Sequence, residues 1–72
     1  MTQKLNNQER KILTDHIECH DRRPIRRDWM VYVDLRDRGL ITLTQVAWAA
    51  GKFRVLTSPA GREALRQLGI NL

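Results

Sequence analysis

The chain has 72 residues, which is enough for one small hydrophobic core and excludes two independent domains with a cleft between them. Hydrophobic residues make up 42% of it and charged residues 29%, a composition that excludes general disorder. Thirteen Lys and Arg against eight Asp and Glu give a formal net charge of +5, which favours an anionic partner. We therefore expect residues 1–72 to form a single basic domain.

The ends of the chain and its cysteine content indicate where the protein acts. Residues 1–11 lack the apolar segment of a secretion signal, and no later run of residues is long enough to span a membrane. Cys19 is alone, so it cannot form an internal disulfide and it suits a reducing compartment. We expect a soluble, cytoplasmic protein that contacts no membrane.

Two helices are predicted in the first half of the chain. Apolar residues at helical spacing predict the first over residues 7–20, with Asn6 or Asn7 as its cap. Pro24 and the polar residues before it break this helix, because the residue before a proline avoids helical angles. The second helix is predicted over residues 25–38. Its apolar arc holds Trp29, Tyr32, Val33 and Leu35, and the opposite face carries Arg27, Asp34, Asp37 and Arg38.

A β-hairpin and a third helix follow. Residues 41–46 and 53–56 are rich in branched and aromatic side chains and predict two strands, with Gly51 in the turn. Thr57 or Ser58 then caps a last helix, which Gly69 ends and whose buried stripe is Ala60, Ala64, Leu65 and Leu68. The predicted fold class is α+β, in the order helix, helix, β-hairpin, helix.

The hairpin is predicted to be apolar on both faces. A turn centred on Ala50 and Gly51, after Ala49, places Trp48 opposite Phe53 and Val46 opposite Val55 on one face. The other face then holds Ile41, Leu43, Ala47 and Leu56. One face is covered either by the first helix and the termini or by a partner protein or second subunit. An exposed pair of Trp48 and Phe53 is a further alternative, in which the rings stack on nucleic-acid bases.

Two motifs flank the hairpin: Leu35-Arg36-Asp37-Arg38-Gly39-Leu40-Ile41 before it and Leu56-Thr57-Ser58-Pro59-Ala60-Gly61-Arg62-Glu63-Ala64-Leu65 after it. Over about residues 25–68 they resemble a reduced or divergent winged helix-turn-helix DNA-binding domain. In bacterial regulators of the multiple-antibiotic-resistance type, a similar Gly-Leu-Ile turn ends the recognition helix. The resemblance implies a winged-helix-like fold, a role in transcription regulation, and contacts to DNA by Lys52 and Arg54 of the wing.

Four arginines gather around the start of the second predicted helix: Arg22, Arg23, Arg26 and Arg27. The free amide groups and the dipole at a helix N-terminus favour an anion there, so these side chains are candidates to bind phosphates of duplex DNA. Arg62 and Arg66 extend the basic edge. The alternative is a solvated turn in which the four arginines pair with Asp21 and Asp28.

The outward face of the second helix argues against base reading in the major groove. Asp34 and Asp37 lie where a major-groove reader presents Arg, Asn, Gln or Ser. If DNA is bound, we therefore expect contacts from the turn and the wing to dominate.

A metal site and an enzyme are both disfavoured. His16 and His20 share a helix face beside Cys19, but no second cluster offers the missing ligands. We expect these histidines to pack near the C-terminal end of the first helix, where a positive charge is favourable. Neither a catalytic triad nor a glycine-rich phosphate loop is present in the sequence. We expect no catalytic residue, metal or cofactor.

The leading hypothesis is a small DNA-binding protein that contacts the backbone of duplex DNA. The alternative is a non-enzymatic adaptor or inhibitor that binds a protein through Val46, Trp48, Phe53 and Val55. In either case the working form could be a homodimer.

Overall fold

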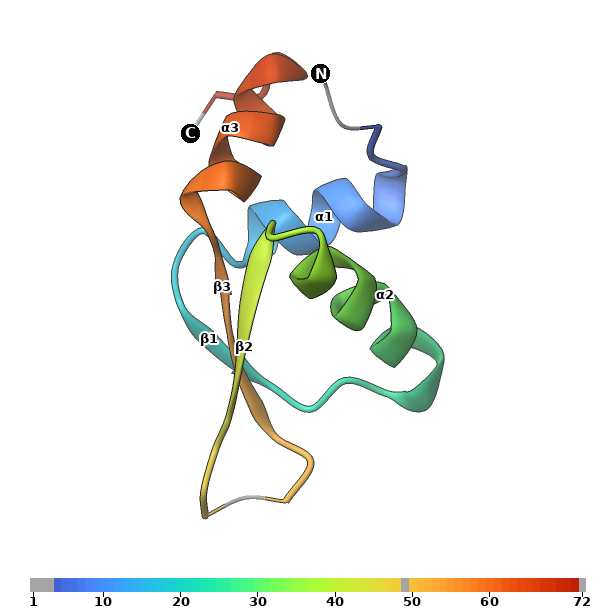
Figure 1. Cartoon of the computed structure of the whole chain (residues 1–72), viewed down its shortest axis with the longest axis vertical. Helices are drawn as coiled ribbons and strands as arrows, with labels where there is room; N and C mark the ends of the chain where they lie inside the picture. Colours follow the sequence, from blue (N-terminus) through green and yellow to red (C-terminus); the bar gives the residue numbers. More distant parts are fainter. Residues whose placement is uncertain (1–3, 49, 72) are drawn as a thin grey trace.

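The computed structural model describes residues 4–48 and 50–71. It has three helices and one three-stranded antiparallel sheet, so the α+β class is confirmed (Figure 1). Ala49 of the predicted turn lies outside the described residues. Along the chain the elements are α1 (Asn7–Asp15), β1 (His20–Arg22), α2 (Arg26–Asp37), β2 (Ile41–Gln45), β3 (Phe53–Thr57) and α3 (Pro59–Gln67). In the described part of the chain no helix has the length and apolarity needed to cross a bilayer.

The first helix is shorter than predicted and is followed by a strand that the sequence pattern did not indicate. A capping box fixes its start, because the Asn6 side chain accepts from the Glu9 amide and Glu9 accepts from the Asn6 amide. The helix ends at Asp15, with His16 as its C-cap. The prediction of helix to residue 20 is wrong because β1 pairs its backbone with the free edge of β3, which gives the sheet the order β1-β3-β2.

The register of the hairpin differs by three residues from the predicted one. Leu43 lies opposite Val55 and Gln45 lies opposite Phe53, and the bond from the Val46 amide to the Lys52 carbonyl, at 2.9 Å, closes a longer loop than expected. An odd shift moves every side chain of one strand to the other face. Ile41, Leu43, Phe53, Val55 and Thr57 therefore share the inner face, while Thr42, Thr44, Arg54 and Leu56 are exposed on the outer one. The prediction of two apolar faces is wrong.

The core lies between this inner face and the helices. Four of its side chains are fully buried, and each comes from a different element: Leu13 of α1, Leu35 of α2, Val55 of β3 and Leu65 of α3. Burying a leucine or valine side chain stabilises a fold by about 1.5–3 kcal/mol, so each of these four positions is a large contribution for so short a chain. Helical spacing in the sequence predicted the three buried leucines on the helices, whereas Val55 was predicted on a hairpin face, and Ala60 of the predicted stripe is exposed.

Hydrogen bonds at the junction between β3 and α3 join these two elements to the rest of the fold. Thr57 donates from its amide to the carbonyl of His16 at 2.8 Å and from its hydroxyl to that of Leu13 at 2.7 Å. Ser58 caps α3 through its side chain and donates from its amide to the Leu40 carbonyl. Gly61 in the first turn of α3 lies against the same carbonyl. The junction sets where the hairpin points relative to the helices.

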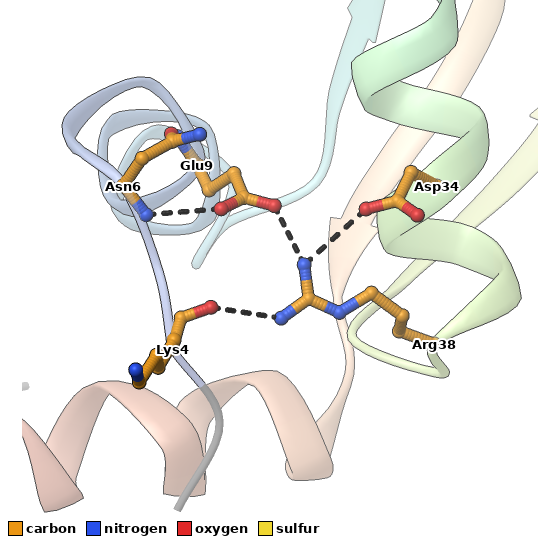
Figure 2. A network of polar contacts seen from close by, with 5 residues as sticks. All are labelled: Lys4, Asn6, Glu9, Asp34 and Arg38. Atoms are coloured by element: carbon orange, nitrogen blue, oxygen red, sulfur yellow. Dashed lines mark hydrogen bonds and ion pairs between the residues drawn. The ribbon is translucent and has the colours of Figure 1, made fainter.

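A polar network ties the N-terminal segment to the end of α2 (Figure 2). The Arg38 guanidinium donates to the Glu9 carboxylate at 2.6 Å, to Asp34 at 3.3 Å and to the Lys4 carbonyl at 3.0 Å. Glu9 is buried, so its charge is compensated mainly by Arg38. Arg38 was predicted on the solvent-facing side of its helix and instead connects α2 to α1.

Candidate nucleic-acid interface

An open groove forms where the segment between β1 and α2 passes the base of the hairpin loop. It has a volume of about 320 Å³ and is lined by Pro24, Arg26, Trp29, Gly51 and Phe53. The hairpin loop and the start of α2 lie toward the same end of the molecule in Figure 1, away from α3. Pairing of β1 with β3 creates this arrangement, since it places Arg22 directly opposite Phe53.

Five cationic side chains gather at this end. Arg22, Arg23, Arg26 and Arg27 are exposed, and Lys52 is half-buried beside Phe53. Among the described residues, none of the five forms a hydrogen bond or an ion pair with another side chain. We call this set, Arg22, Arg23, Arg26, Arg27 and Lys52, the cationic end.

The two carboxylates that could have neutralised the four arginines have other partners. Asp21 forms an ion pair with Arg54 at 3.2 Å, across the β1-β3 pairing. Asp28 accepts a hydrogen bond from the Gln8 amide group at 3.1 Å. The alternative prediction, in which the four arginines pair with Asp21 and Asp28, is therefore wrong.

The start of α2 adds to the positive character of this end. Ile25 occupies the N-cap and supplies no side-chain hydrogen bond, whereas Asn6 and Ser58 cap the other two helices. The first amide groups of a helix without a cap remain available to solvent or to an anion. Asp28 in the first turn offsets part of this effect.

Two predicted phosphate ligands lie elsewhere. Arg54 lies within β3, in the strand predicted for it, but its side chain forms an ion pair with Asp21. Arg62 lies on α3 and donates to the Ile17 carbonyl at 3.1 Å, so it is not part of the cationic end. Arg66, considered as an extension, pairs with Glu63 on the surface of α3. Their fixed partners separate these three arginines from the five cations above.

Each carboxylate in the C-terminal half of α2 has an arginine partner. Asp34 pairs with Arg38 at 3.3 Å and Asp37 pairs with Arg36 at 3.1 Å. Both carboxylates are exposed, so they still disfavour a nucleic-acid phosphate beside the C-terminal half of α2.

The residues predicted as a protein-binding face do not share one surface. Val46 and Val55 are buried in the chain's own core. Phe53 is half-buried and packs on Trp29, with 4.9 Å between ring centroids, so it is not paired with Trp48. Trp48 is 80% exposed in the hairpin loop. These four residues do not form one face because the hairpin register differs by three residues from the predicted one.

The histidines have different surroundings from those expected. His16 is buried, its ring lies edge-on to Tyr32 and to His20, and its Nδ1 has no hydrogen-bond partner among the described residues. Burial and the positive charge of Arg22 lower the pKa of His16 from its usual 6.5, with a small contribution from His20 and an opposing one from Asp15. The expectation that a positive charge is favourable here is wrong for His16. Within the described residues, His, Cys, Asp and Glu form no group of three that could hold a metal ion.

The lowered pKa of His16 predicts a loss of stability in mild acid. A group whose pKa is lower in the folded state takes up protons more readily when the chain is unfolded. Protonation therefore favours unfolding, so the contribution of neutral His16 to the free energy of unfolding is complete above about pH 6.5 and declines as the pH falls below that. The free energy of unfolding, from urea titrations between about pH 7 and pH 5.5, is expected to decrease with pH in the native chain. His16→Gln is expected to remove this slope, and His20→Gln, at an exposed position, to keep it. A slope that His16→Gln leaves unchanged would contradict the assignment.

Sequence patterns did not identify Pro24 and Trp29 as groove residues. Trp29 was predicted on the apolar arc of its helix, and it is half-buried there. Its contact with Phe53 depends on how α2 packs against the hairpin, which no periodic pattern within α2 indicates. Comparison with protein-family models, curated proteins and solved structures finds no match to this chain.

Proposed function

We propose that this chain is a small protein that binds duplex DNA through phosphate contacts from the cationic end, as a transcription regulator does. The observation that carries the proposal is the gathering of Arg22, Arg23, Arg26, Arg27 and Lys52 at one end of the molecule, without internal partners among the described residues. Arginine guanidinium groups donate two parallel hydrogen bonds to a phosphate, which makes them well suited to the DNA backbone.

The order of elements supports a reduced winged-helix arrangement. A short strand precedes α2, a hairpin follows it, and the sheet order β1-β3-β2 joins both to one surface. In this proposal α2 takes the place of the recognition helix and the loop between β2 and β3 takes the place of the wing. Because Asp34 and Asp37 are exposed on α2, the N-terminal turn of α2 and the loop make the contacts, and the C-terminal half stays away from the backbone.

Salt dependence of binding tests the proposal. Fluorescence anisotropy with a labelled duplex is expected to give a slope of log affinity against log salt of about −4.5, if each of the five cations neutralises one phosphate. Arg26→Ala combined with Arg27→Ala is expected to reduce the slope by about 1.8 and the affinity on the order of tenfold or more.

Arg10→Ala combined with Lys11→Ala is the matched control. These two cations are also exposed, but they lie on α1, and their removal changes the net charge by the same amount. The control pair is expected to leave the slope close to that of the native chain. Absence of binding at low salt, or equal losses in the two double variants, would overturn the proposal.

A further inference from the structure

The groove has an apolar, aromatic surface bordered by positive charge, which complements the flat base and the negative phosphate of a single nucleotide. Its walls include the half-buried rings of Trp29 and Phe53 together with Pro24, and Arg26 provides a guanidinium at its edge. Arg22 lies opposite Phe53 on the neighbouring strand, and Lys52 precedes Phe53 in the chain. An apolar surface is therefore bordered by cations that have no internal partner among the described residues.

A nucleic-acid base with its own phosphates matches both surfaces. Bases stack on aromatic side chains and on proline or guanidinium planes regardless of sequence, and the adjoining phosphates pair with Arg and Lys. Inside a duplex both faces of a base are covered by its neighbours, so an unpaired base offers the groove a free face that an internal base pair does not. A volume of about 320 Å³ is at the small end of the range for ligand sites, which suits one base and not an extended segment.

We propose that the groove between the start of α2 and the hairpin binds an unpaired DNA base, so that the chain prefers duplexes that carry a single-stranded extension. This inference rests on the proposed function, because the cationic end must first hold the backbone. It adds a distinct recognition element, the unpaired base, to phosphate contacts that are independent of strand pairing.

Three labelled probes separate base binding from phosphate binding. They are a blunt duplex, the same duplex with an unpaired thymidine extension, and the same duplex with an abasic extension of equal length, which keeps the phosphates but has no bases. The thymidine extension is expected to bind about fivefold more tightly than the abasic one, or better, because one stacked base contributes at least that factor. Phe53→Leu is expected to bring this ratio close to one, with the fold checked by circular dichroism.

Tryptophan emission gives a second measurement that needs no change in the groove. The sequence contains two tryptophans, so Trp48→Phe leaves Trp29 as the single reporter. Trp29 emission is expected to be quenched by the thymidine extension and not by the abasic one, because only a base can stack on the ring.

The possible outcomes separate this inference from the proposed function. A thymidine preference together with Trp29 quenching supports both. Equal affinity for the three probes without quenching overturns the inference and leaves duplex binding in place. The inference is also overturned, with duplex binding left in place, if the groove is found to bind a side chain of a protein partner. Failure of every probe to bind at low salt overturns both.

Discussion

Gly61→Ala is expected to destabilise the protein strongly, although alanine is the better helix former. A Cβ atom at this position of α3 would lie 2.2 Å from the Leu40 carbonyl oxygen and 2.7 Å from the Thr57 methyl carbon. Replacing glycine by alanine inside a helix gains about 1 kcal/mol from backbone entropy. Overpacking costs about 1–3 kcal/mol even where the neighbours are side chains. Here the nearest atom belongs to backbone that is fixed by its bond from the Ser58 amide, so we expect the steric cost to exceed the gain and the net loss to be at least about 2 kcal/mol.

Thermal and urea denaturation would measure this loss. For a domain of this size 1 kcal/mol corresponds to about 4–8 °C in Tm, so Gly61→Ala is expected to lower Tm by roughly 10 °C. Ala60→Gly at the exposed neighbouring position measures the helix propensity alone and is expected to cost only about 1 kcal/mol. A Gly61→Ala variant that is as stable as the native chain would show that α3 does not approach Leu40 this closely.

The part of the fold that local pattern determines could be predicted from the sequence. Each of the three predicted helices has apolar residues at helical spacing, and Leu13, Leu35 and Leu65 of these stripes are fully buried. The cap at Ser58 and the positive φ of Gly69 mark the two ends of α3 as expected. These signals act within a few residues, which is why they are visible without the tertiary structure.

The part that depends on pairing between distant segments could not be predicted. The strand β1 consists of His20, Asp21 and Arg22, which are all exposed, so no alternation distinguishes it from a loop. The hairpin register depends on the length of the loop before Lys52, and the flanking strands contain enough apolar residues to suit either face. The arginine cluster was visible as a cluster, but its lack of internal partners depends on Asp21 pairing with Arg54, which follows from β1.

Arg38→Met is expected to be the other strongly destabilising change, because it leaves the buried Glu9 carboxylate and the Lys4 carbonyl without the guanidinium (Figure 2). Removing one partner of a fully buried ion pair costs about 3–5 kcal/mol. The Arg38 side chain is 26% exposed and the Glu9 side chain 11%, so water compensates in part and we expect a loss of about 2 kcal/mol. Arg36→Met is the matched control, since its pair with Asp37 is exposed and such pairs contribute about 0–1 kcal/mol.

A double-mutant cycle separates the charge of Glu9 from its capping role. Glu9→Gln removes the charge but keeps a side-chain oxygen that can accept from the Asn6 amide, so the capping box is retained. Residues in direct contact show coupling energies of about 0.5–3 kcal/mol, and we expect the combination of Glu9→Gln with Arg38→Met to fall in the upper half of that range. The double variant is then more stable than Arg38→Met alone, because it no longer buries an uncompensated carboxylate. Additive losses in urea denaturation would mean that the 2.6 Å contact between Arg38 and Glu9 contributes nothing to the attachment of α1 to α2.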